Sequence, residues 1–201
     1  MFAPKILKSS VVTLIGVSLI VTAFGALAAP PKPITVSKLT DTLYYFAGHG
    51  GNILISAGVD GVFMVDDQYP TQSGPIQEAL ENLSLPAPKF LINTHWHHDH
   101  SGSNQHFENQ GALIFAHENV RKRLSEAQFI AFFKSKVPAA HPSALPIITF
   151  SDRMSLHLND DDIVVVHGAN AHTDGDAMIY FKRDNVLHTG DVFFENMYPF
   201  I

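Results

Sequence analysis

The chain has 201 residues, of which 46% are hydrophobic and 16% charged, and its formal net charge is −6. This length suits one domain, and the hydrophobic content excludes a disordered chain, which could not bury enough apolar surface to offset its ordering entropy. The absence of cysteine excludes disulfide scaffolds, thiol nucleophiles and cysteine-rich zinc sites, and the negative charge without a basic run argues against nucleic-acid binding.

The N-terminal segment is predicted to be a cleavable signal peptide over residues 1–28. Lys5 and Lys8 precede an uncharged apolar run at 11–27, and small residues at 26–28 offer a cleavage site. The alternative is a membrane anchor that stays in place, which two glycines within the run disfavour. A cleaved leader implies export to a bacterial periplasm or beyond, with no stable membrane anchor afterwards.

The remaining chain is expected to consist of a Pro-rich linker at 29–33 and one domain over 34–201. The sequence stops on an apolar run at 191–201 that has no polar tail. Because a folded domain seldom ends on exposed Phe and Ile side chains, we expect the sequence to be cut short at its C-terminus.

The first half of the domain is predicted to begin with strands. Short apolar runs separated by Gly and Asp predict an antiparallel meander at 42–47, 52–56 and 62–66. The apolar spacing at 74–83 predicts a helix with Ser73 as its cap and Pro75 in its first turn. Residues 89–93 predict a buried strand, because the centre of this run is continuously apolar.

The second half alternates helices and strands. A helix is expected after the loop at 94–102, a strand at 112–116, and a longer helix at 118–136. The phenylalanines at 129–133 are expected to lie in the core, and three prolines within 137–146 predict a long loop. Further strands are expected at 147–151, 154–158, 163–167, 178–182 and 186–189. Strands outnumber helices and the two alternate, so the fold class is α/β or α+β, in layers.

The chain has 12 histidines, and the most informative cluster directly follows a buried strand as Thr94-His95-Trp96-His97-His98-Asp99-His100-Ser101-Gly102. Five ionisable side chains at this place are too polar to be buried unpaired, and neutral imidazoles with a carboxylate suit a divalent ion such as zinc. His95 and His97 point the same way in an extended segment and can reach one ion. Asp99 and His100 lie on the turn beyond and could serve a second ion. The alternative is a surface cluster with adventitious metal affinity.

The pattern His95-x-His97-x-Asp99-His100 resembles the signature of the metallo-β-lactamase fold superfamily. Residues 171–176 resemble the family's third motif, in which a histidine completes the first metal site, and 188–191 resemble the fourth, in which an aspartate bridges two metals. The resemblance covers residues 34–201. It implies a four-layer αβ/βα sandwich of the α/β class, with its C-terminal part missing from this sequence.

The same resemblance implies two zinc ions per complete domain. The ligands that it implies are His95, His97 and His172 for the first zinc, Asp99 and His100 for the second, and Asp191 between them. Asp99 is also the expected catalytic residue, since it would orient the attacking water. The superfamily supplies one more histidine from a loop beyond the fourth motif, and this sequence has no residue at that place.

The neighbouring polar residues are assigned weaker roles. His98 is expected to face solvent and Trp96 to pack beside the site. Asp174 and Asp176 are expected to orient the ligands through hydrogen bonds. His49, in a Gly-rich loop, is expected to be structural or exposed, with a place at the mouth of the site as the alternative.

Two zinc ions that share a water lower its pKa to roughly 7, so that hydroxide is available without a strong base. We therefore predict an exported zinc-dependent hydrolase of a small-molecule ester, thioester, lactone or amide. The absence of Cys and the aspartate at position 191 make the chain similar to the general hydrolases of the superfamily. The alternatives are a true metallo-β-lactamase acting on β-lactam antibiotics, a non-catalytic member, and an iron-dependent oxidoreductase of the same fold.

Overall fold

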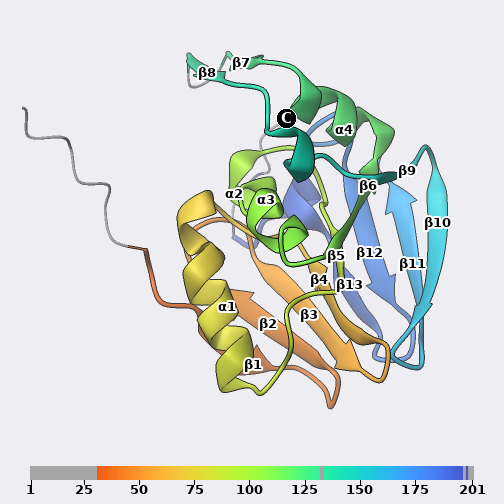
Figure 1. The fold of residues 1–201 in the computed structure, drawn as a ribbon. Coiled ribbons are helices and arrows are strands. Elements are labelled where there is room, and N and C mark those ends of the chain that lie inside the picture. Colours follow the sequence, from red (N-terminus) through yellow and green to blue (C-terminus); the bar gives the residue numbers. More distant parts are fainter. Residues whose placement is uncertain (1–30, 132–133, 197, 199–201) are drawn as a thin grey trace, which may run out of the picture.

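The computed structural model describes residues 31–131, 134–196 and 198 (Figure 1). The predicted signal peptide at 1–28 lies outside the described residues. Within the described part of the chain, no helix has the length and apolar character that a membrane crossing requires.

Two β-sheets pack against each other at the centre of the molecule (Figure 1). The strands of the larger sheet are β1 (Thr35–Lys38), β2 (Leu43–Ala47), β3 (Ile53–Gly58), β4 (Gly61–Val65), β5 (Phe90–Ile92), β6 (Leu113–His117) and β9 (Ile148–Phe150). The strands of the smaller sheet are β10 (Arg153–Leu158), β11 (Asp161–His167), β12 (Ala177–Phe181) and β13 (Val186–His188). Within each sheet the strands lie in this order.

The pairing changes direction within the larger sheet. β1 to β4 pair antiparallel, which confirms the predicted meander, whereas β4, β5, β6 and β9 pair in parallel. Parallel neighbours end at the same edge of a sheet. The loops that follow β4 and β5 therefore lie side by side, and they carry Asp66 and the histidine-rich segment at 94–102.

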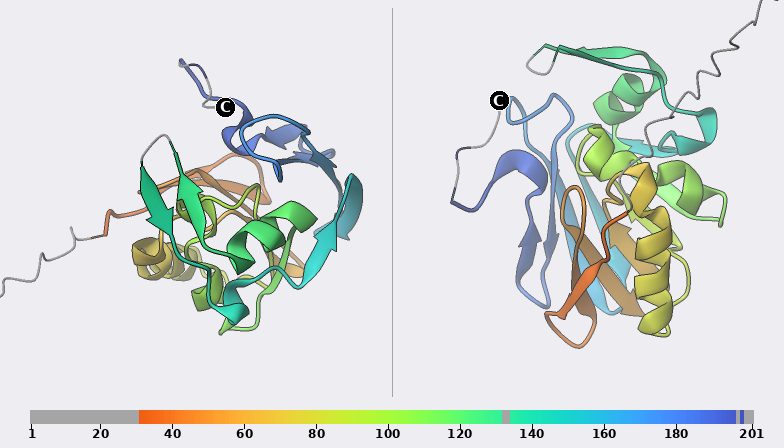
Figure 2. Two further views of the ribbon diagram at one scale, coloured as in Figure 1. Left: turned by 90° about the horizontal axis from the view of Figure 1, so that it is seen from above. Right: turned by 90° about the vertical axis from the view of Figure 1, so that its left-hand side faces the viewer.

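The α-helices of the described residues lie on the side of the larger sheet that faces away from the smaller one (Figure 2). They are α1 (Ser73–Asn82), α2 (His98–Ser101), α3 (Asn104–Glu108) and α4 (Glu118–Ser125). In α1, Ile76 and Leu80 are buried at helical spacing against Phe46 and Ile55 of the sheet, as the pattern at 74–83 predicts.

The predicted capping role of Ser73 is wrong. Ser73 is the first residue of α1, its hydroxyl donates to the carbonyl of Pro70 at 3.0 Å, and the N-cap position belongs to Gln72. The 3-10 turn at Pro70–Gln72 leads directly into the helix, so the chain is already helical at the position where a capping side chain would act.

The helix predicted over 118–136 is too long, because α4 ends at Ser125 and a β-hairpin follows. The hairpin strands are β7 (Gln128–Ile130) and β8 (Ser135–Val137), which pair antiparallel. Gln128 Nε2 donates to the carbonyl oxygens of Arg123 and Glu126. A side chain thus satisfies the carbonyl group of Arg123 in the last turn, and the backbone leaves the helix with an extended residue at Glu126.

The expected phenylalanine core at 129–133 is also wrong at the position that can be assessed. Phe129 lies on β7 and is 61% exposed. Phe132 and Phe133 lie outside the described residues. The hairpin is a separate two-stranded sheet, so it offers Phe129 no second layer to pack against.

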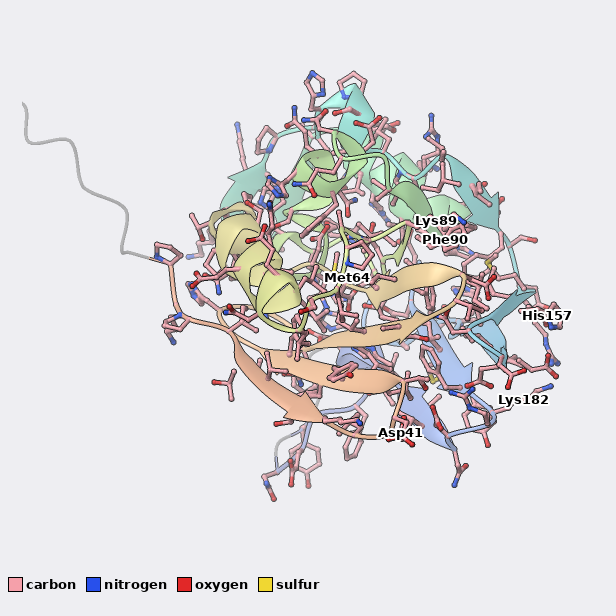
Figure 3. The ribbon with its side chains drawn as sticks, turned by 60° about the horizontal axis from the view of Figure 1, so that its bottom comes forward. Asp41, Met64, Lys89, Phe90, His157 and Lys182 are labelled. Carbon is pink, nitrogen blue, oxygen red and sulfur yellow. The ribbon has the colours of Figure 1, made fainter. Side chains whose placement is uncertain are left out.

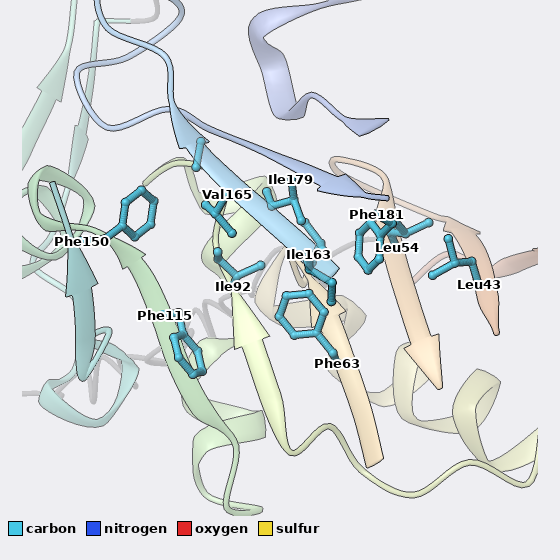
Figure 4. Packing of buried hydrophobic residues seen from close by; sticks show 12 residues of the cluster. Leu43, Leu54, Phe63, Ile92, Phe115, Phe150, Ile163, Val165, Ile179 and Phe181 are labelled. Atoms are coloured by element: carbon cyan, nitrogen blue, oxygen red, sulfur yellow. The ribbon is translucent and has the colours of Figure 1, made fainter. Parts of the chain in front are cut away.

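The main core lies between the two sheets. Phe63 of β4 and Phe181 of β12 are fully buried, and their ring centroids are 6.0 Å apart. Figure 4 shows Leu54, Ile92 and Ile163 beside them, from strands of both sheets. The described residues therefore form three layers, helices, sheet and sheet, of a mixed α/β sandwich, which confirms the predicted fold class.

Charged side chains lie at the periphery of this sandwich. His157 Nδ1 and Lys182 Nζ approach the two carboxylate oxygens of Asp162 at 2.6 and 3.8 Å (Figure 3). On another part of the surface, Lys89 Nζ lies 5.1 Å from the ring centroid of Phe90 (Figure 3). Asp162 is exposed, so it provides a surface carboxylate with which buried ones can be compared.

We expect Phe181→Ala to lower the free energy of unfolding by about 3–5 kcal/mol, because the cavity would lie between the two sheets. Urea unfolding followed by circular dichroism measures the change. Val59→Ala is the control, since Val59 is 97% exposed and its truncation removes no core contact. Equal effects of the two substitutions would contradict the assignment of this core.

Candidate metal centre

Three loops at strand ends bring the predicted ligands together. The loop after β5 carries His95 and His97, the loop between β11 and β12 carries His172, and the 3-10 turn after β13 carries Asp191. His95 Nε2 lies 3.1 Å from His97 Nδ1, which lies 2.9 Å from His172 Nε2. One nitrogen of each ring therefore faces a common point, which is the arrangement that a tetrahedral divalent ion requires of three of its ligands.

Hydrogen bonds determine which nitrogen of His95 faces this point. The Thr94 hydroxyl donates to Asp66 Oδ2 at 2.8 Å, so its oxygen is left to accept the Nδ1–H of His95 at 3.0 Å. The lone pair of His95 therefore lies on Nε2, toward His97 and His172. A metal would find this imidazole in the tautomer that it needs.

A second group shares His95 and adds His100 and Asp191. His100 Nδ1 lies 2.7 Å from Asp66 Oδ2, and His100 Nε2 lies 3.1 Å from Asp191 Oδ1. The second contact is close but lacks hydrogen-bond alignment, so the buried Nε2 has no hydrogen-bond partner within the described residues. A carboxylate behind one ring nitrogen and an unsatisfied nitrogen in front fit a metal ligand.

Asp191 reaches both groups. Its second oxygen, Oδ2, lies 3.7 Å from His172 Nε2, while Oδ1 contacts His100. Asp99 is more peripheral, since its Oδ2 lies 3.7 Å from His100 Nε2 and its side chain is 33% exposed. Of the six predicted ligands, Asp99 is the one that joins neither three-residue group among the described residues.

Burial and charge divide the histidines into two classes. Burial, together with the charges of His172 and His100, lowers the pKa of His97 to about 4. Burial and the other histidines lower the pKa of His95 well below its usual value. Burial would also lower the pKa of His100, but Asp66 and Asp191 together raise it well above its usual value. In the metal-free protein at neutral pH, His95 and His97 are therefore neutral, whereas His100 is a cation between two carboxylates.

The pKa of Asp191 moves in the opposite direction to that of its partner. Burial alone would raise the pKa of this carboxyl, but the close approach and charge of His100, with the charges of His172 and His97, lower it. Asp191 is therefore a carboxylate at neutral pH, the form in which it can bind a cation.

Two glycines make room for these side chains. A Cβ on Gly51 would lie 2.1 Å from His100 Cε1, so only glycine leaves space for the imidazole. Gly190 has φ +53°, and a Cβ there would lie 2.8 Å from Thr94 Cβ. The Gly-rich segment at 48–51 and the turn before Asp191 thus need glycine because they contact the histidine-rich loop.

Asp66 is the residue of this site to which the sequence analysis assigned no role. It is fully buried, has φ 61°, and accepts hydrogen bonds from Thr94 N at 2.7 Å, from Thr94 Oγ1 and from His100 Nδ1. The sequence offered one signal for this role, namely an aspartate directly after a buried strand. Functional polar residues gather at the ends of parallel strands.

The residues with weaker assignments lie around this site. His98 is exposed, and Trp96 packs with Ala116 and Val120 while its ring contacts that of His97. Both positions agree with the sequence analysis. The Asp176 carboxylate is buried and accepts from the backbone N–H and the hydroxyl of Thr173, beside His172.

A cavity of about 450 Å³ opens beside the second group. Asp99, His100 and Asp191 line its polar side, and Leu54 and Phe193 are among its apolar lining residues. His49 is exposed, packs against the ring of Tyr69 at 4.9 Å, and is not one of the residues that line this cavity.

Comparisons with known proteins agree with the geometry. A family model described as the metallo-beta-lactamase superfamily matches residues 40–201. A hydroxyacylglutathione hydrolase of Pelagibacter ubique is 24% identical over 126 residues, which cover 62% of this chain and 44% of that protein.

Solved structures share the fold at low sequence identity. A metallo-β-lactamase of Cronobacter sakazakii superposes with a TM-score of 0.68 at 16% identity, over 79% of this chain and 62% of that one. A class B3 di-zinc metallo-β-lactamase from an Alaskan soil metagenome gives 0.66 at 19% identity, over 75% of this chain and 58% of that one. The chain thus spans between 44% and 62% of the lengths of these relatives.

We expect Asp66→Asn to weaken metal binding by about 10- to 100-fold, because the carboxylate behind His100 and Thr94 would be lost. Competition with a chromophoric zinc chelator measures the affinity. Asp162→Asn is the control, since it neutralises an exposed carboxylate whose partners, His157 and Lys182, belong to neither group of proposed ligands. Unchanged zinc affinity in Asp66→Asn would contradict the orienting role of this residue.

We also expect acid to destabilise the metal-free protein through His97. The folded pKa of about 4 lies below the usual histidine value of 6.5, so the unfolded chain binds a proton that the folded chain does not. This contribution to stability is present above pH 6.5 and is lost as the pH falls toward 4.

His97→Gln should therefore lose about 1–2 kcal/mol less free energy of unfolding than the unsubstituted protein between pH 7 and pH 5. Urea titrations in the presence of a chelator measure the difference. His98→Gln, an exposed neighbour, should keep the original pH dependence, and parallel pH curves for all three proteins would contradict the assignment.

Proposed function

The chain belongs to the metallo-β-lactamase superfamily, and from this we propose that it is an exported zinc-dependent hydrolase of small molecules. The observation that supports the proposal most strongly is the convergence of three imidazole nitrogens beside the His100–Asp191 pair. The sequence contains no Cys, so its donors are imidazoles and carboxylates, and these suit zinc. Export rests on the signal-peptide pattern of residues 1–28.

The donor set would hold two ions. We assign His95, His97 and His172 to the first ion, Asp99 and His100 to the second, and Asp191 to the position between them. When bound, such ions lower the pKa of an attacking water to about 7 and polarise the oxygen of the substrate bond under attack.

The side chains of this chain would contribute position and charge. Asp99 is the proposed catalytic residue, because its partly exposed carboxylate stands at the cavity and can accept a hydrogen bond from the attacking water. Asp66 and Thr94 would hold two of the imidazoles in the ligand tautomer throughout turnover.

The proposed substrate is an ester, thioester, lactone or amide. Support for a thioester comes from the Pelagibacter relative, whose name states hydrolysis of a hydroxyacylglutathione. The second candidate is a β-lactam, since the fold superposes on metallo-β-lactamases. Both substrate types present a carbonyl carbon to the same nucleophile, so one site geometry serves either.

The test combines metal analysis with a panel of nitrocefin, a lactone, a thioester and a phosphodiester. We expect about two zinc ions per complete domain, turnover of at least one carbonyl substrate, and a loss of about 10³-fold or more in kcat/KM for His95→Ala and Asp99→Ala. His98→Ala is the matched control, because His98 lies in the same loop but is exposed and outside both ligand groups.

Other outcomes identify the alternatives. Zinc binding without turnover of any panel member would favour a non-catalytic member of the fold. Iron in the purified protein, with oxygen consumption, would favour an oxidoreductase. Activity that survives His95→Ala and Asp99→Ala would contradict the proposed site.

A further inference from the structure

His172 differs from the other histidines of the site in how its backbone is supported. His95, His97 and His100 lie in one segment directly after β5 and on α2, whereas His172 lies in the irregular loop at 168–176 between β11 and β12. A loop without a strand or helix of its own needs other contacts to hold a ligand in place to within a fraction of an ångström.

Helix α4 makes these contacts through Asp174. Asn119 Nδ2 donates to the backbone carbonyl of Asp174 at 2.7 Å. Two groups of Arg123 donate hydrogen bonds to Asp174 Oδ2, Nη2 at 2.8 Å and Nε at 3.1 Å. Both donors are on the helix face that the loop covers, one turn apart.

The next residue of the loop, Gly175, shows how closely the loop approaches the helix. A Cβ on Gly175 would lie 2.8 Å from Val120 Cγ2 and 3.1 Å from Val120 N. The backbone of the loop therefore packs directly on the first turn of α4, between the two donors. Two consecutive residues of the loop, Asp174 and Gly175, thus contact α4, at Asn119, Val120 and Arg123.

Helix α4 is anchored by buried side chains. Val120 and Leu124 are buried in a cluster with Ala116, and Trp96 packs against this cluster. The ring of Trp96 lies 4.4 Å from that of His97. One helix therefore lies behind two of the three histidines of the first group, His97 through Trp96 and His172 through Asp174.

The hairpin after α4 fixes the Arg123 side chain. Arg123 Nη1 donates to Gln128 Oε1 at 3.2 Å, and Gln128 Nε2 donates back to the Arg123 carbonyl at 2.9 Å. The guanidinium is thus held from the hairpin side while its other edge binds Asp174. Such two-sided fixation reduces the conformational entropy that Arg123 would otherwise lose in forming the pair.

We propose that Asn119 and Arg123 of α4 are positioning residues that set the metal affinity of the three-histidine group by fixing the His172 loop through Asp174. This inference rests on the proposed metal-binding function. The Arg123 and Asp174 side chains are 44% and 42% exposed, and an ion pair so exposed contributes little to the stability of a fold. Its effect is therefore expected in metal binding rather than in folding.

The experiment measures zinc affinity by chelator competition and the melting temperature of the metal-free protein, on the full chain. We expect Arg123→Gln and Asn119→Ala each to weaken the tighter zinc site by about 3- to 10-fold, and to leave the metal-free melting temperature within about 2 °C. The zinc affinity of Arg123→Lys should lie between those of the unsubstituted protein and Arg123→Gln, because lysine keeps the charge but loses the two-pronged contact.

Two further variants sharpen the comparison. Lys122→Gln is the matched control, since Lys122 is an exposed basic residue on the same helix and should bind zinc like the unsubstituted protein. The exchange Arg123→Asp with Asp174→Arg restores an ion pair with reversed polarity and should recover part of the lost affinity. A parallel drop in the metal-free melting temperature would show a purely structural role and overturn the inference.

His172→Ala separates this inference from the proposed function. If His172→Ala weakens zinc binding and Arg123→Gln with Asn119→Ala does not, the positioning role is wrong and the metal site stands. If His172→Ala leaves zinc affinity unchanged, the three-histidine site itself is wrong.

Discussion

The carboxylate of Asp66 is the interaction on which the rest of the site depends. Fully buried at the end of β4, it accepts hydrogen bonds from the backbone and hydroxyl of Thr94 and from His100 Nδ1. Burying a carboxylate is costly unless such donors compensate it. In return, one group orients two rings, that of His95 through the Thr94 hydroxyl and that of His100 directly. Its left-handed backbone, φ 61°, turns the chain so that the carboxylate faces the neighbouring loop.

The sheet pairing is what brings Asp66 to that loop. β4 and β5 run in parallel with Val65 opposite Ile92, so Asp66 and Thr94 both follow at the same sheet edge although 28 residues separate them. His172 and Asp191 also lie at this edge, because they follow strands β11 and β13 of the second sheet. The packing of the two sheets, in which Phe63 contacts Phe181, thus brings together proposed ligands that no local sequence pattern connects.

Much of this arrangement could be predicted from the sequence. Alternating apolar runs predicted the strands, and the spacing from His95 to His100 predicted a cluster with metal-ligand chemistry. The family resemblance added His172 and Asp191. Asp66 could not be found in this way, because one aspartate at a strand end looks the same whether it faces solvent or a neighbouring loop. The helix predicted over 118–136 was too long because Gln128 donates to the carbonyl groups of Arg123 and Glu126 at the end of α4, where the apolar pattern of the sequence continues.

The proposed ligands therefore differ in what holds them in place. His95 and His100 are fixed by buried hydrogen bonds at a strand end, where water does not compete. Asp191 is fixed by a turn whose Gly190 packs on Thr94. The His172 loop is tied to α4 by contacts that are partly exposed and therefore weaker. Within the loop, the buried Asp176 carboxylate accepts two hydrogen bonds from Thr173, beside His172. The proposed influence of α4 therefore concerns where this loop stands relative to the other proposed ligands.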